Sequence, residues 1–386
     1  MRILYIASNT SLKNGASKCL LEILKGGVDK DIVPFVCVPD YGELCIELDK
    51  IHVTYFIVPE YTWVWRKSIG TNFNIIKKIK FFMRKYIYNM FSVYKISRII
   101  KNYRIDIVHI NTLTTYIGAV AAKASKVPYV WHIREFMEED LESEFCDRSY
   151  SIKLLNNSSA VLCISKAIFN KYSKILDNNI LNLVYDGVNQ NTFHLSRQEI
   201  FNDTDINILM LGRFVKTKGQ YDLVRAINIL NLKGIINIKC KIIGQYADAE
   251  YVNLISSYID ANSLREIISL HDYVSSPELL LNKADILCVC SVAEAFGLVT
   301  VEGMMSGCLV MGADSGCTAE LVDNYKNGIL YKCGDYVDLA RMIYWVIAHK
   351  CEAKKIASQG CTDSIQKYSL EQNINNIIRI YNIILK

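Results

Sequence analysis

Residues 291–307 read Ser-Val-Ala-Glu-Ala-Phe-Gly-Leu-Val-Thr-Val-Glu-Gly-Met-Met-Ser-Gly and hold two carboxylates, Glu294 and Glu302, eight positions apart. An apolar run at 284–290 precedes them and predicts a buried strand, and the pattern becomes helical after Gly297 and ends at the final glycine. A helix N-terminus therefore follows the carboxyl end of a strand, where open α/β sheets bind ligands and free backbone N–H groups attract anions. Because carboxylates repel phosphate, we expect both glutamates to accept hydrogen bonds from hydroxyl groups, such as those of a ribose or a sugar ring.

The pattern Ser-x-x-Glu-Ala-Phe-Gly, with a second Glu eight residues after the first, resembles the signature of retaining glycosyltransferases of family 4, the glycosyl transferases group 1, which have the GT-B fold. The resemblance implies that Glu294 contacts the donor sugar and that Glu302 holds the ribose hydroxyls. It also implies that a diphosphate is cradled by the backbone amides of Phe296, Gly297, Leu298 and Val299. The alternative is that both glutamates are solvated carboxylates on an ordinary amphipathic helix.

A second motif, Gly212-Arg-Phe-Val-Lys-Thr-Lys-Gly219, follows an apolar run at 206–211. It resembles the family's Gly-Arg-x4-Lys-Gly, in which the cations that correspond to Arg213 and Lys218 grip the diphosphate. Two fixed cations suit this chemistry, because negative charge develops on a nucleoside diphosphate as it departs. The alternative is a pair of surface cations after a strand. Farther along, Gly316 lies in a loop that resembles the family's and could approach the sugar.

Strand-like and helical segments alternate along the whole chain, which predicts an α/β fold with doubly wound parallel sheets. The resemblance implies a GT-B arrangement, in which two Rossmann-like domains face an interdomain cleft. We expect an acceptor-binding domain at 1–188, a nucleotide-sugar-binding domain at 189–369, and a final helix at 370–386 that returns to the first domain. The predicted strands are 3–7, 33–38, 53–58, 105–110, 127–131, 160–164 and 183–185 in the first half and 206–211, 238–243, 286–289, 309–311 and 328–331 in the second.

Two places in the first half are candidates for the same site. The loop after the first strand contains Gly15 and Ala16, where the family usually has two adjacent glycines and this chain has Asn14 before a single one. The resemblance places Gly15 and Ala16 near the donor phosphate or the acceptor, although a plain turn explains the glycine as well. His132 follows another strand, and similar enzymes have a histidine there that faces the donor sugar. A satisfied structural histidine is the alternative.

Composition narrows the class of protein. The chain has 386 residues, of which 51% are hydrophobic and 22% charged, so it is long enough for two globular domains with cores of their own. The thirteen cysteines show no CxxC spacing, and no signal peptide precedes the first strand, so we expect a reduced, cytoplasmic protein without a metal site. We expect no membrane span and no nucleic-acid partner.

The positive charge is concentrated in one segment. Residues 61–105 contain eleven Lys and Arg residues and no acid, interleaved with apolar residues such as Ile75, Ile79 and Phe82. Such a segment favours either an amphipathic contact with an anionic membrane surface or a domain helix whose lysines form a solvated outer face.

These patterns together predict a metal-independent retaining glycosyltransferase that needs no cofactor. Its substrates would be a nucleoside diphosphate sugar, with UDP or GDP as the carrier, and a glycan or lipid-linked acceptor in surface polysaccharide synthesis. For a lipid-linked acceptor we expect a peripheral position on the inner face of the cell membrane. The alternatives are a non-catalytic partner subunit of a transferase and a sugar-nucleotide epimerase of similar fold. The sequence identifies neither the sugar and base of the donor nor the acceptor.

Overall fold

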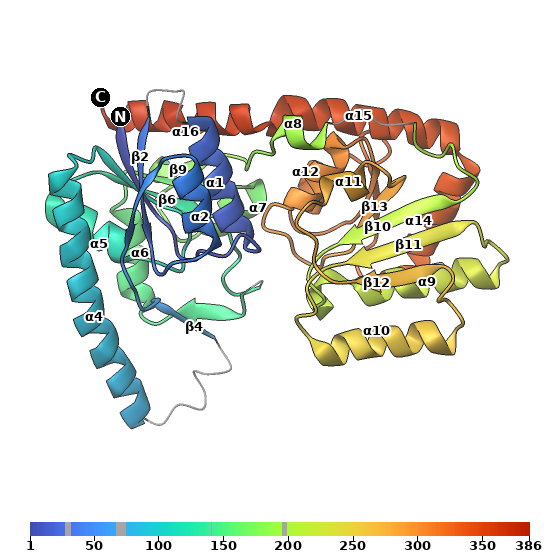
Figure 1. The fold of residues 1–386 in the computed structure, drawn as a ribbon, viewed down its shortest axis with the longest axis horizontal. Helices are drawn as coiled ribbons and strands as arrows, with labels where there is room; N and C mark the ends of the chain where they lie inside the picture. Colours follow the sequence, from blue (N-terminus) through green and yellow to red (C-terminus); the bar gives the residue numbers. More distant parts are fainter. Residues whose placement is uncertain (28–31, 67–74, 140, 195–198) are drawn as a thin grey trace. The chain divides into compact units, whose positions relative to one another are not determined.

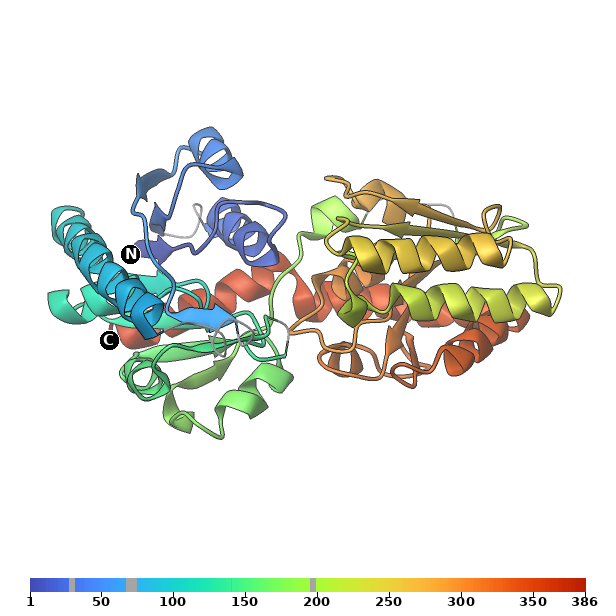
Figure 2. The same ribbon diagram turned by 90° about the horizontal axis from the view of Figure 1, so that it is seen from below.

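The computed structural model describes residues 1–27, 32–66, 75–139, 141–194 and 199–386. Within these ranges, the side chains of residues 66, 75–82 and 84 are not described. The chain forms two compact units. Unit 1 comprises Met1–Gly187 and Leu370–Lys386, and unit 2 comprises Val188–Ser369. Both are drawn in Figures 1 and 2.

Unit 1 is built on a seven-stranded parallel sheet with the order β3-β2-β1-β5-β6-β8-β9. Its strands are β1 (Arg2–Ile6), β2 (Val33–Val38), β3 (Thr54–Ile57), β5 (Ile107–Ile110), β6 (Tyr129–Ile133), β8 (Ala160–Cys163) and β9 (Leu181–Leu183). A separate antiparallel ribbon pairs β4 (Val64–Arg66) with β7 (Ser143–Phe145). The order reverses between β1 and β5, so a ligand crevice is expected at their carboxyl ends.

Helices form further layers on the unit 1 sheet. Its helices are α1 (Gly15–Gly27), α2 (Glu43–Lys50), α4 (Ile75–Asn102), α5 (Ile117–Ser125), α6 (Arg148–Asn156), α7 (Lys166–Tyr172), the 3₁₀ turn η1 (Asn178–Ile180) and α16 (Leu370–Ile384). Helix α1 packs against α2 and α16, and α4 packs against α5. Buried side chains of α1, α2 and α16 share one hydrophobic core with the sheet. The chain after unit 2 therefore supplies part of the unit 1 core.

Unit 2 has a six-stranded parallel sheet with the order β12-β11-β10-β13-β14-β15. Counted within the unit, this is the order 3-2-1-4-5-6 of a dinucleotide-binding fold. Its strands are β10 (Ile206–Leu211), β11 (Ile238–Ile243), β12 (Ile268–His271), β13 (Ile286–Val289), β14 (Leu309–Ala313) and β15 (Ile329–Tyr331). Its helices are α8 (Gln190–Phe193), η2 (Lys216–Lys218), α9 (Gln220–Leu232), α10 (Ala249–Ala261), α11 (Glu278–Leu281), α12 (Leu298–Met305), α13 (Thr318–Leu321), α14 (Tyr336–Ala348) and α15 (Lys350–Tyr368).

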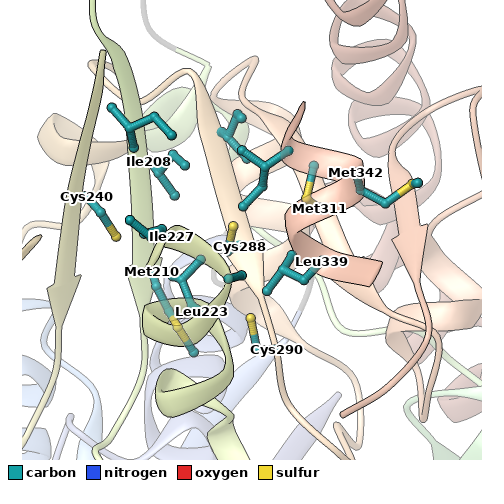
Figure 3. Close-up of a cluster of buried hydrophobic side chains, with 14 of the residues drawn as sticks. Ile208, Met210, Leu223, Ile227, Cys240, Cys288, Cys290, Met311, Leu339 and Met342 are labelled. Carbon is teal, nitrogen blue, oxygen red and sulfur yellow. The ribbon is translucent and has the colours of Figure 1, made fainter. Parts of the chain in front are cut away.

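The core of unit 2 lies between its sheet and its helices. Helix α9 packs against α10 and α14, and α12 packs against α15. Figure 3 shows Ile208 and Met210 of β10 facing Leu223 and Ile227 of α9 across this core. The central strand β13 is covered on both faces, and it is accordingly a continuous apolar run, Ile-Leu-Cys-Val. The predicted α/β class with two doubly wound parallel sheets is confirmed.

Helix α4 carries most of the basic segment, and Lys95, Arg98 and Lys101 on it are exposed, as a solvated basic face requires. It is 28 residues long, and Lys85 on it is only 5% exposed, so this lysine does not belong to a solvated outer face. Ile75, Ile79 and Phe82 fall among the residues whose side chains lie outside the description. No helix in the described part of the chain combines the length and the apolar character needed to cross a membrane.

Candidate active site

In unit 2 the candidate residues come from the two strands at which the strand order reverses. Arg213 and Lys218 follow β10, and Glu294 follows the adjacent parallel strand β13. The carboxyl ends of these strands lie at one edge of the sheet, and a crevice forms there because the following chains leave towards opposite faces. The two motifs, separated by about 70 residues in the sequence, therefore meet at one place.

The loop after β10 is held in shape by its backbone and by one buried amide. Gly219 has φ +74°, and a Cβ added there would lie 2.3 Å from the carbonyl oxygen of Cys290, so only glycine fits. The side-chain amide of Gln220, which is buried, donates to the carbonyl oxygens of Arg213 at 2.8 Å and Gly212 at 3.3 Å. The loop therefore presents Arg213 on a fixed backbone. Its side chain is exposed, and no ion pair of this guanidinium is found among the described residues.

Lys218 and Glu294 form an ion pair. The ammonium Nζ of Lys218 donates to Oε1 of Glu294 at 2.6 Å, and each side chain is slightly less than one-fifth exposed. The loops on either side are tied by the amide of Val292, which donates to the carbonyl oxygen of Thr217 at 2.9 Å. The structure thus brings together two residues that the sequence named separately, and each charge has an opposite charge beside it before any ligand binds.

The loop after β14 packs closely against Glu294. Gly316 has φ +51°, and a Cβ added there would lie 2.8 Å from the backbone nitrogen of Glu294. The amide of Cys317 donates to the carbonyl oxygen of Glu294 at 3.0 Å, and the hydroxyl of Ser315 donates to that of Ser291 at 3.0 Å. Gly316 therefore has a structural role: it lets two loops meet and holds the backbone of Glu294 in place.

Helix α12 begins at the predicted position. Gly297, with φ +90°, precedes it, and the first intrahelical hydrogen bonds run from Thr300 and Val301 to the Gly297 carbonyl oxygen. The amides of Leu298 and Val299 come before those bonds, so no earlier turn of the helix satisfies them, and they are suited to hold an anion.

Two of the predicted residues around this helix are buried. Glu302 is 4% exposed and sits one turn into α12. The ring of Phe296 is 3% exposed and packs edge-on against Tyr368 at 5.9 Å, so its side chain belongs to the core and only its backbone can face a ligand.

In unit 1, the start of α1 differs from an open glycine loop. Gly15 is the first residue of α1, and the amide of Ala16 donates to Oδ1 of Asn14 at 2.9 Å. Asn14, which stands where the resembling family has a glycine, therefore caps the helix with its side chain. The carbonyl oxygen of Ala16 accepts from Asn111 at 2.9 Å. A phosphate at this position would have to displace the Asn14 cap.

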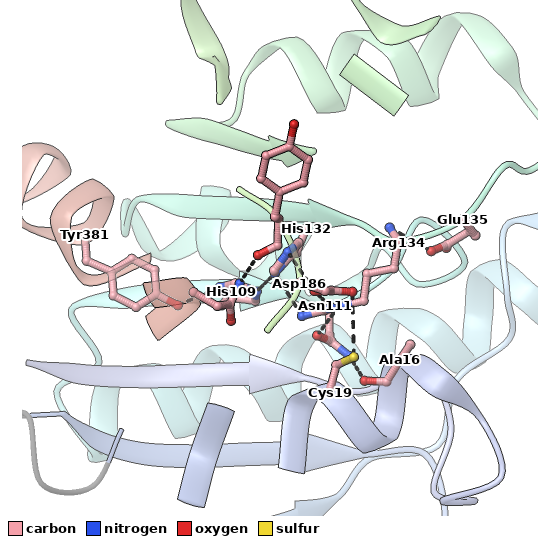
Figure 4. A network of polar contacts seen from close by, with 11 residues as sticks. Ala16, Cys19, His109, Asn111, His132, Arg134, Glu135, Asp186 and Tyr381 are labelled. Atoms are coloured by element: carbon pink, nitrogen blue, oxygen red, sulfur yellow. Dashed lines mark hydrogen bonds and ion pairs between the residues drawn. The ribbon is translucent and has the colours of Figure 1, made fainter. Parts of the chain in front are cut away.

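His132, at the end of β6, is fully buried in a polar network (Figure 4). Its Nδ1 lies 3.2 Å from Nε2 of His109 and 3.2 Å from a guanidinium nitrogen of Arg134. On the other side, Nδ1 of His109 lies 2.6 Å from the hydroxyl of Tyr381 in α16. Burial, and secondarily the Arg134 charge, lowers the pKa of His109 to about 3 and holds the pKa of His132 well below its usual value. Both imidazoles are therefore neutral near pH 7.

The hydrogen-bonding partners determine the tautomer of each histidine. A guanidinium can only donate, so Nδ1 of His132 is an acceptor and its ring proton lies on Nε2. Nε2 of His109, which faces the same Nδ1, then carries a proton too, and its Nδ1 accepts from Tyr381. The Nε2–H of His132 is buried and has no hydrogen-bond partner among the described residues; Oδ1 of Asp186 is 4.0 Å away. It is therefore a buried hydrogen-bond donor whose acceptor, if it has one, lies outside the described residues.

Residues 186–189 differ from the family pattern. This chain has Asp-Gly-Val-Asn, whereas the family that it resembles has Asn-Gly-Val-Asp, and the contacts of Asp186 explain the exchange. The Asp186 carboxylate is buried and pairs with the guanidinium of Arg134, and its other oxygen lies 3.7 Å from Sγ of Cys19. Asn189, at the exchanged position, caps α8 by accepting from the amide of Asn191 at 3.1 Å. The acid therefore sits where a buried arginine needs a counter-ion.

Several members of these networks were not singled out from the sequence. These residues hold other residues of the networks in place, and no local sequence motif marks them. They are His109, Asn111, Asp186, Gln220 and Tyr381. An Asp in place of the expected Asn at position 186 was the one available signal. Among the described residues no group of three or more His, Cys, Asp or Glu side chains is arranged to hold a metal ion.

Comparison with known families gives two matches that follow one another along the chain. The model of the Glycosyltransferase Family 4 matches residues 14–191, and the model of the Glycosyl transferases group 1 matches residues 192–361. The boundary between them lies four residues from the boundary between the two units.

Individual relatives agree with the family models. An uncharacterized glycosyltransferase of Methanocaldococcus jannaschii is 27% identical over 300 residues, which cover 76% of this chain and 80% of the relative. A capsular polysaccharide biosynthesis glycosyltransferase of Staphylococcus aureus is 25% identical over 188 residues, 49% of this chain and 48% of that protein. The fold is that of the Anabaena protein HepE, solved in complex with UDP, with a TM-score of 0.79 at 20% identity over 98% of this chain and 99% of that one.

Proposed function

Because the chain belongs to the glycosyltransferases of group 1 and has their two Rossmann-like halves, we propose that it transfers a sugar from a nucleoside diphosphate sugar to a hydroxyl group with retention of configuration. The observation that carries the proposal is the meeting of Arg213, the Lys218–Glu294 pair and the start of α12 at the carboxyl ends of β10 and β13. Cations and free amides at one point suit a diphosphate, and nearby carboxylates suit hydroxyl groups.

In the proposed reaction the bond between the anomeric carbon and the diphosphate oxygen breaks. The acceptor's hydroxyl oxygen bonds to that carbon from the same face, and its proton passes to the leaving phosphate oxygen. Arg213 and Lys218 neutralise the charge that grows on the diphosphate, and the amides of Leu298 and Val299 bind it. We propose that the reaction needs no metal ion and no cofactor, because Arg213 and Lys218 neutralise the diphosphate as a divalent ion does in other phosphate chemistry.

We assign the remaining residues by their chemistry. Glu302 accepts hydrogen bonds from the ribose hydroxyls, and Glu294 from the transferred sugar. The neutral His132 donates from Nε2 to a sugar oxygen. Within unit 1, Gly15 and Ala16 follow β1, where an acceptor can approach, or a donor phosphate that displaces the Asn14 cap.

The acceptor that we propose is a glycan or lipid-linked glycan in surface polysaccharide synthesis, and UDP is the first carrier to test. A relative acts in capsular polysaccharide biosynthesis, and a protein of the same fold is solved with UDP. For a lipid-linked acceptor the enzyme would work in the cytoplasm at the inner face of the cell membrane. The basic segment 61–105 would then face its anionic lipids.

The alternatives are a non-catalytic partner subunit and a sugar-nucleotide epimerase. A partner subunit has no need to keep Arg213, Lys218, Glu294 and Glu302 together, and all four are present here. An epimerase needs an acid and a base at the sugar. The fully buried His132 is held neutral, and Glu294 is already paired with Lys218.

One experiment separates the three functions. Binding of UDP, GDP and ADP is measured by calorimetry, and turnover of the matching sugar nucleotides is followed by release of the diphosphate and by the identity of the sugar. We expect diphosphate release for one donor, and Arg213→Ala should lower kcat about 10²-fold or more, as loss of a transition-state donor does. Lys233→Ala, an exposed lysine elsewhere in unit 2, is the matched control.

Each other outcome has a meaning. Nucleotide binding without turnover of any donor would indicate a partner subunit, and a changed sugar that stays on the diphosphate would indicate an epimerase. Near-normal turnover in Arg213→Ala would remove the role given to this residue.

A further inference from the structure

The outer face of α4 is apolar. Met83, Ile87, Met90, Phe91 and Tyr94 recur at the spacing of one helix face, and each is between 52% and 70% exposed. Single exposed apolar residues are common, but five large ones along one face of a helix indicate a surface that contacts another protein, a ligand or a membrane. Figures 1 and 2 show α4 running along the outside of unit 1.

A cavity opens beside this face. It has a volume of about 430 Å³, within the usual range for sites that take a small molecule or chain, about 300–1,000 Å³. Aromatic and aliphatic side chains of α4, α5, α6 and the chain before β4 form most of its wall. The apolar lining residues are Trp63, Tyr86, Met90, Val93, Tyr94, Tyr116, Val120, Ala124 and Tyr150.

The wall of the cavity is held in place. The ring of Trp63 stacks on Tyr116 at 5.0 Å, and both are buried. Asn89 donates to the hydroxyl of Tyr116 at 2.9 Å and to the carbonyl oxygen of Tyr61 at 2.8 Å. Among the described residues of the lining Lys85 is the one cation, and its ammonium lies 5.4 Å from the centre of the Tyr116 ring. The cavity is therefore a formed feature of the fold and not a gap between loosely placed side chains.

Exposed basic residues follow the lining residues along α4 and α5. Arg98 adjoins the lining residue Ser97 in α4, Lys123 adjoins Ala124 in α5, and both are exposed. Lys101 and Arg104 continue the exposed basic stretch at the end of α4. The carboxylate of Asp147, which also lines the cavity, caps α6 by accepting from the amide of Tyr150 at 2.9 Å.

From these features we infer that unit 1 contains a binding site for an anionic membrane phospholipid, in which one acyl chain enters the cavity between α4, α5 and α6. The headgroup meets Arg98, Lys101 and Lys123, while the exposed apolar side chains of α4 enter the outer part of the bilayer. The inference deepens the membrane location proposed above, and it can fail while glycosyl transfer stands, because lipid binding is measured separately from turnover.

A lipid fits these observations better than a second copy of the chain or another protein. An apolar face, a mostly apolar cavity and exposed cations next to it in the sequence, with no acid between residues 61 and 105, match a molecule that is apolar along one part and negatively charged at its end. Interfacial helices have this division between an apolar and a basic side.

The test uses vesicles and the fluorescence of Trp63 in the full chain. Phosphatidylglycerol vesicles whose acyl chains carry bromine should quench tryptophan emission, because bromine in the cavity would lie against Trp63. Phosphatidylcholine vesicles with the same brominated chains should quench little. Trp63→Phe should remove this quenching without changing sedimentation with the vesicles, which shows that the signal comes from the cavity.

Two variants separate the chain from the headgroup. Val93→Phe fills the cavity and should abolish the quenching of Trp63 while sedimentation is kept; Leu232→Phe, on the exposed end of α9, is its control. Arg98→Glu with Lys101→Glu should weaken sedimentation about thirtyfold or more, since each basic residue near an anionic surface contributes about fivefold. Lys233→Glu with Lys332→Glu, exposed in unit 2, is the matched control.

Equal quenching by both lipids, or quenching unchanged in Val93→Phe, would overturn the proposed site. If the lipid-free protein dimerises in sedimentation velocity and Phe91→Ser makes it monomeric, a second copy covers this face and the inference is wrong. UDP binding should be unchanged in every variant, which keeps this test independent of the proposed donor site.

Discussion

The pairing of Lys218 with Glu294 shows how single residues prepare this site. A partly exposed ion pair contributes little to stability, about 0–1 kcal/mol. Stability therefore does not explain why this pair forms between loops whose shape depends on glycines with positive φ. Its effect is on position: the ammonium is held beside Glu294, in the loop that leads into α12, before any ligand binds. If the diphosphate binds as we propose, Lys218 must exchange or share its carboxylate partner, which would leave Glu294 to face the sugar.

This arrangement separates the roles of the two glutamates. Glu294→Ala removes the competitor for Lys218, so we expect UDP to bind equally or more tightly while sugar transfer falls about 10²-fold or more. Glu302→Ala should weaken UDP binding, because it removes the acceptor proposed for the ribose hydroxyls. Calorimetry with UDP and steady-state kinetics measure both effects, with Glu250→Ala, an exposed acid of α10, as the control. A loss of UDP affinity larger in Glu294→Ala than in Glu302→Ala would mean that the two roles are exchanged.

At the residue scale, motifs predict which side chains to examine but not their partners. The family pattern names Lys218 and Glu294 separately, and the ion pair between them follows from two parallel strands becoming neighbours. In the same way Asp186 looks like a turn residue in the sequence, whereas in the fold it neutralises a buried arginine. The sequence does not reveal such pairs, since the contacts join residues about 50 to 80 positions apart.

Among the elements, central strands were predicted more accurately than edges. The predicted bounds of β2, β10, β11 and β13 agree with the structure residue for residue, and each of these segments is mostly apolar. The edge strand β9 was predicted at 183–185 and lies at Leu181–Leu183, where only one neighbouring strand fixes the register. The β4–β7 ribbon was missed: each strand has three residues, and its partner is 79 positions away.

The polar network joins β5, β6 and α16 and should make unit 1 sensitive to acid. An unfolded chain protonates histidine near pH 6.5, whereas the pKa of folded His109 is about 3 and that of His132 is also lowered. Between these values the unfolded state holds more protons, so the free energy of unfolding rises with pH and falls as the pH is lowered from 6.5. For His109 alone the loss by pH 5 is about 2 kcal/mol, from 1.5 pH units at 1.36 kcal/mol each.

Denaturant unfolding at a series of pH values checks this prediction. His109→Gln should reduce the pH dependence by about one proton, and His271→Gln, an exposed histidine of unit 2, should leave it unchanged. A variant with the full acid sensitivity of the original chain would show that His109 is not the group that takes up the proton.

On the scale of the whole molecule, unit 1 is made from two pieces of chain separated by all of unit 2. Helix α16 contributes Ile374, Ile377, Ile380 and Tyr381 to the core, each at most 5% exposed. Burial of four such side chains contributes about 6–12 kcal/mol, comparable with the stability of an entire domain, about 5–15 kcal/mol. Unit 1 therefore depends on a helix that its first 187 residues do not supply.

Removal of residues 370–386 should consequently unfold unit 1 and spare unit 2. We expect calorimetry to show one unfolding transition instead of two, and limited proteolysis to leave a fragment near 188–369. Removal of 385–386 alone, beyond the end of α16, is the control and should change neither. A truncated chain that keeps both transitions would show that α16 is dispensable for the first core.

The position of α16 also sets an order of events during translation. The ribosome releases every strand of the first sheet before the helix that completes its core, and between them it must make the whole of the second unit. Unit 1, whose first residues are translated before unit 2, can therefore complete its core only after unit 2 has been translated. Until that helix emerges, the place that receives Tyr381 is open, and the nascent chain there is a natural substrate for chaperones. A stop codon introduced just before residue 370 would therefore leave unit 2 folded and unit 1 without its last core helix.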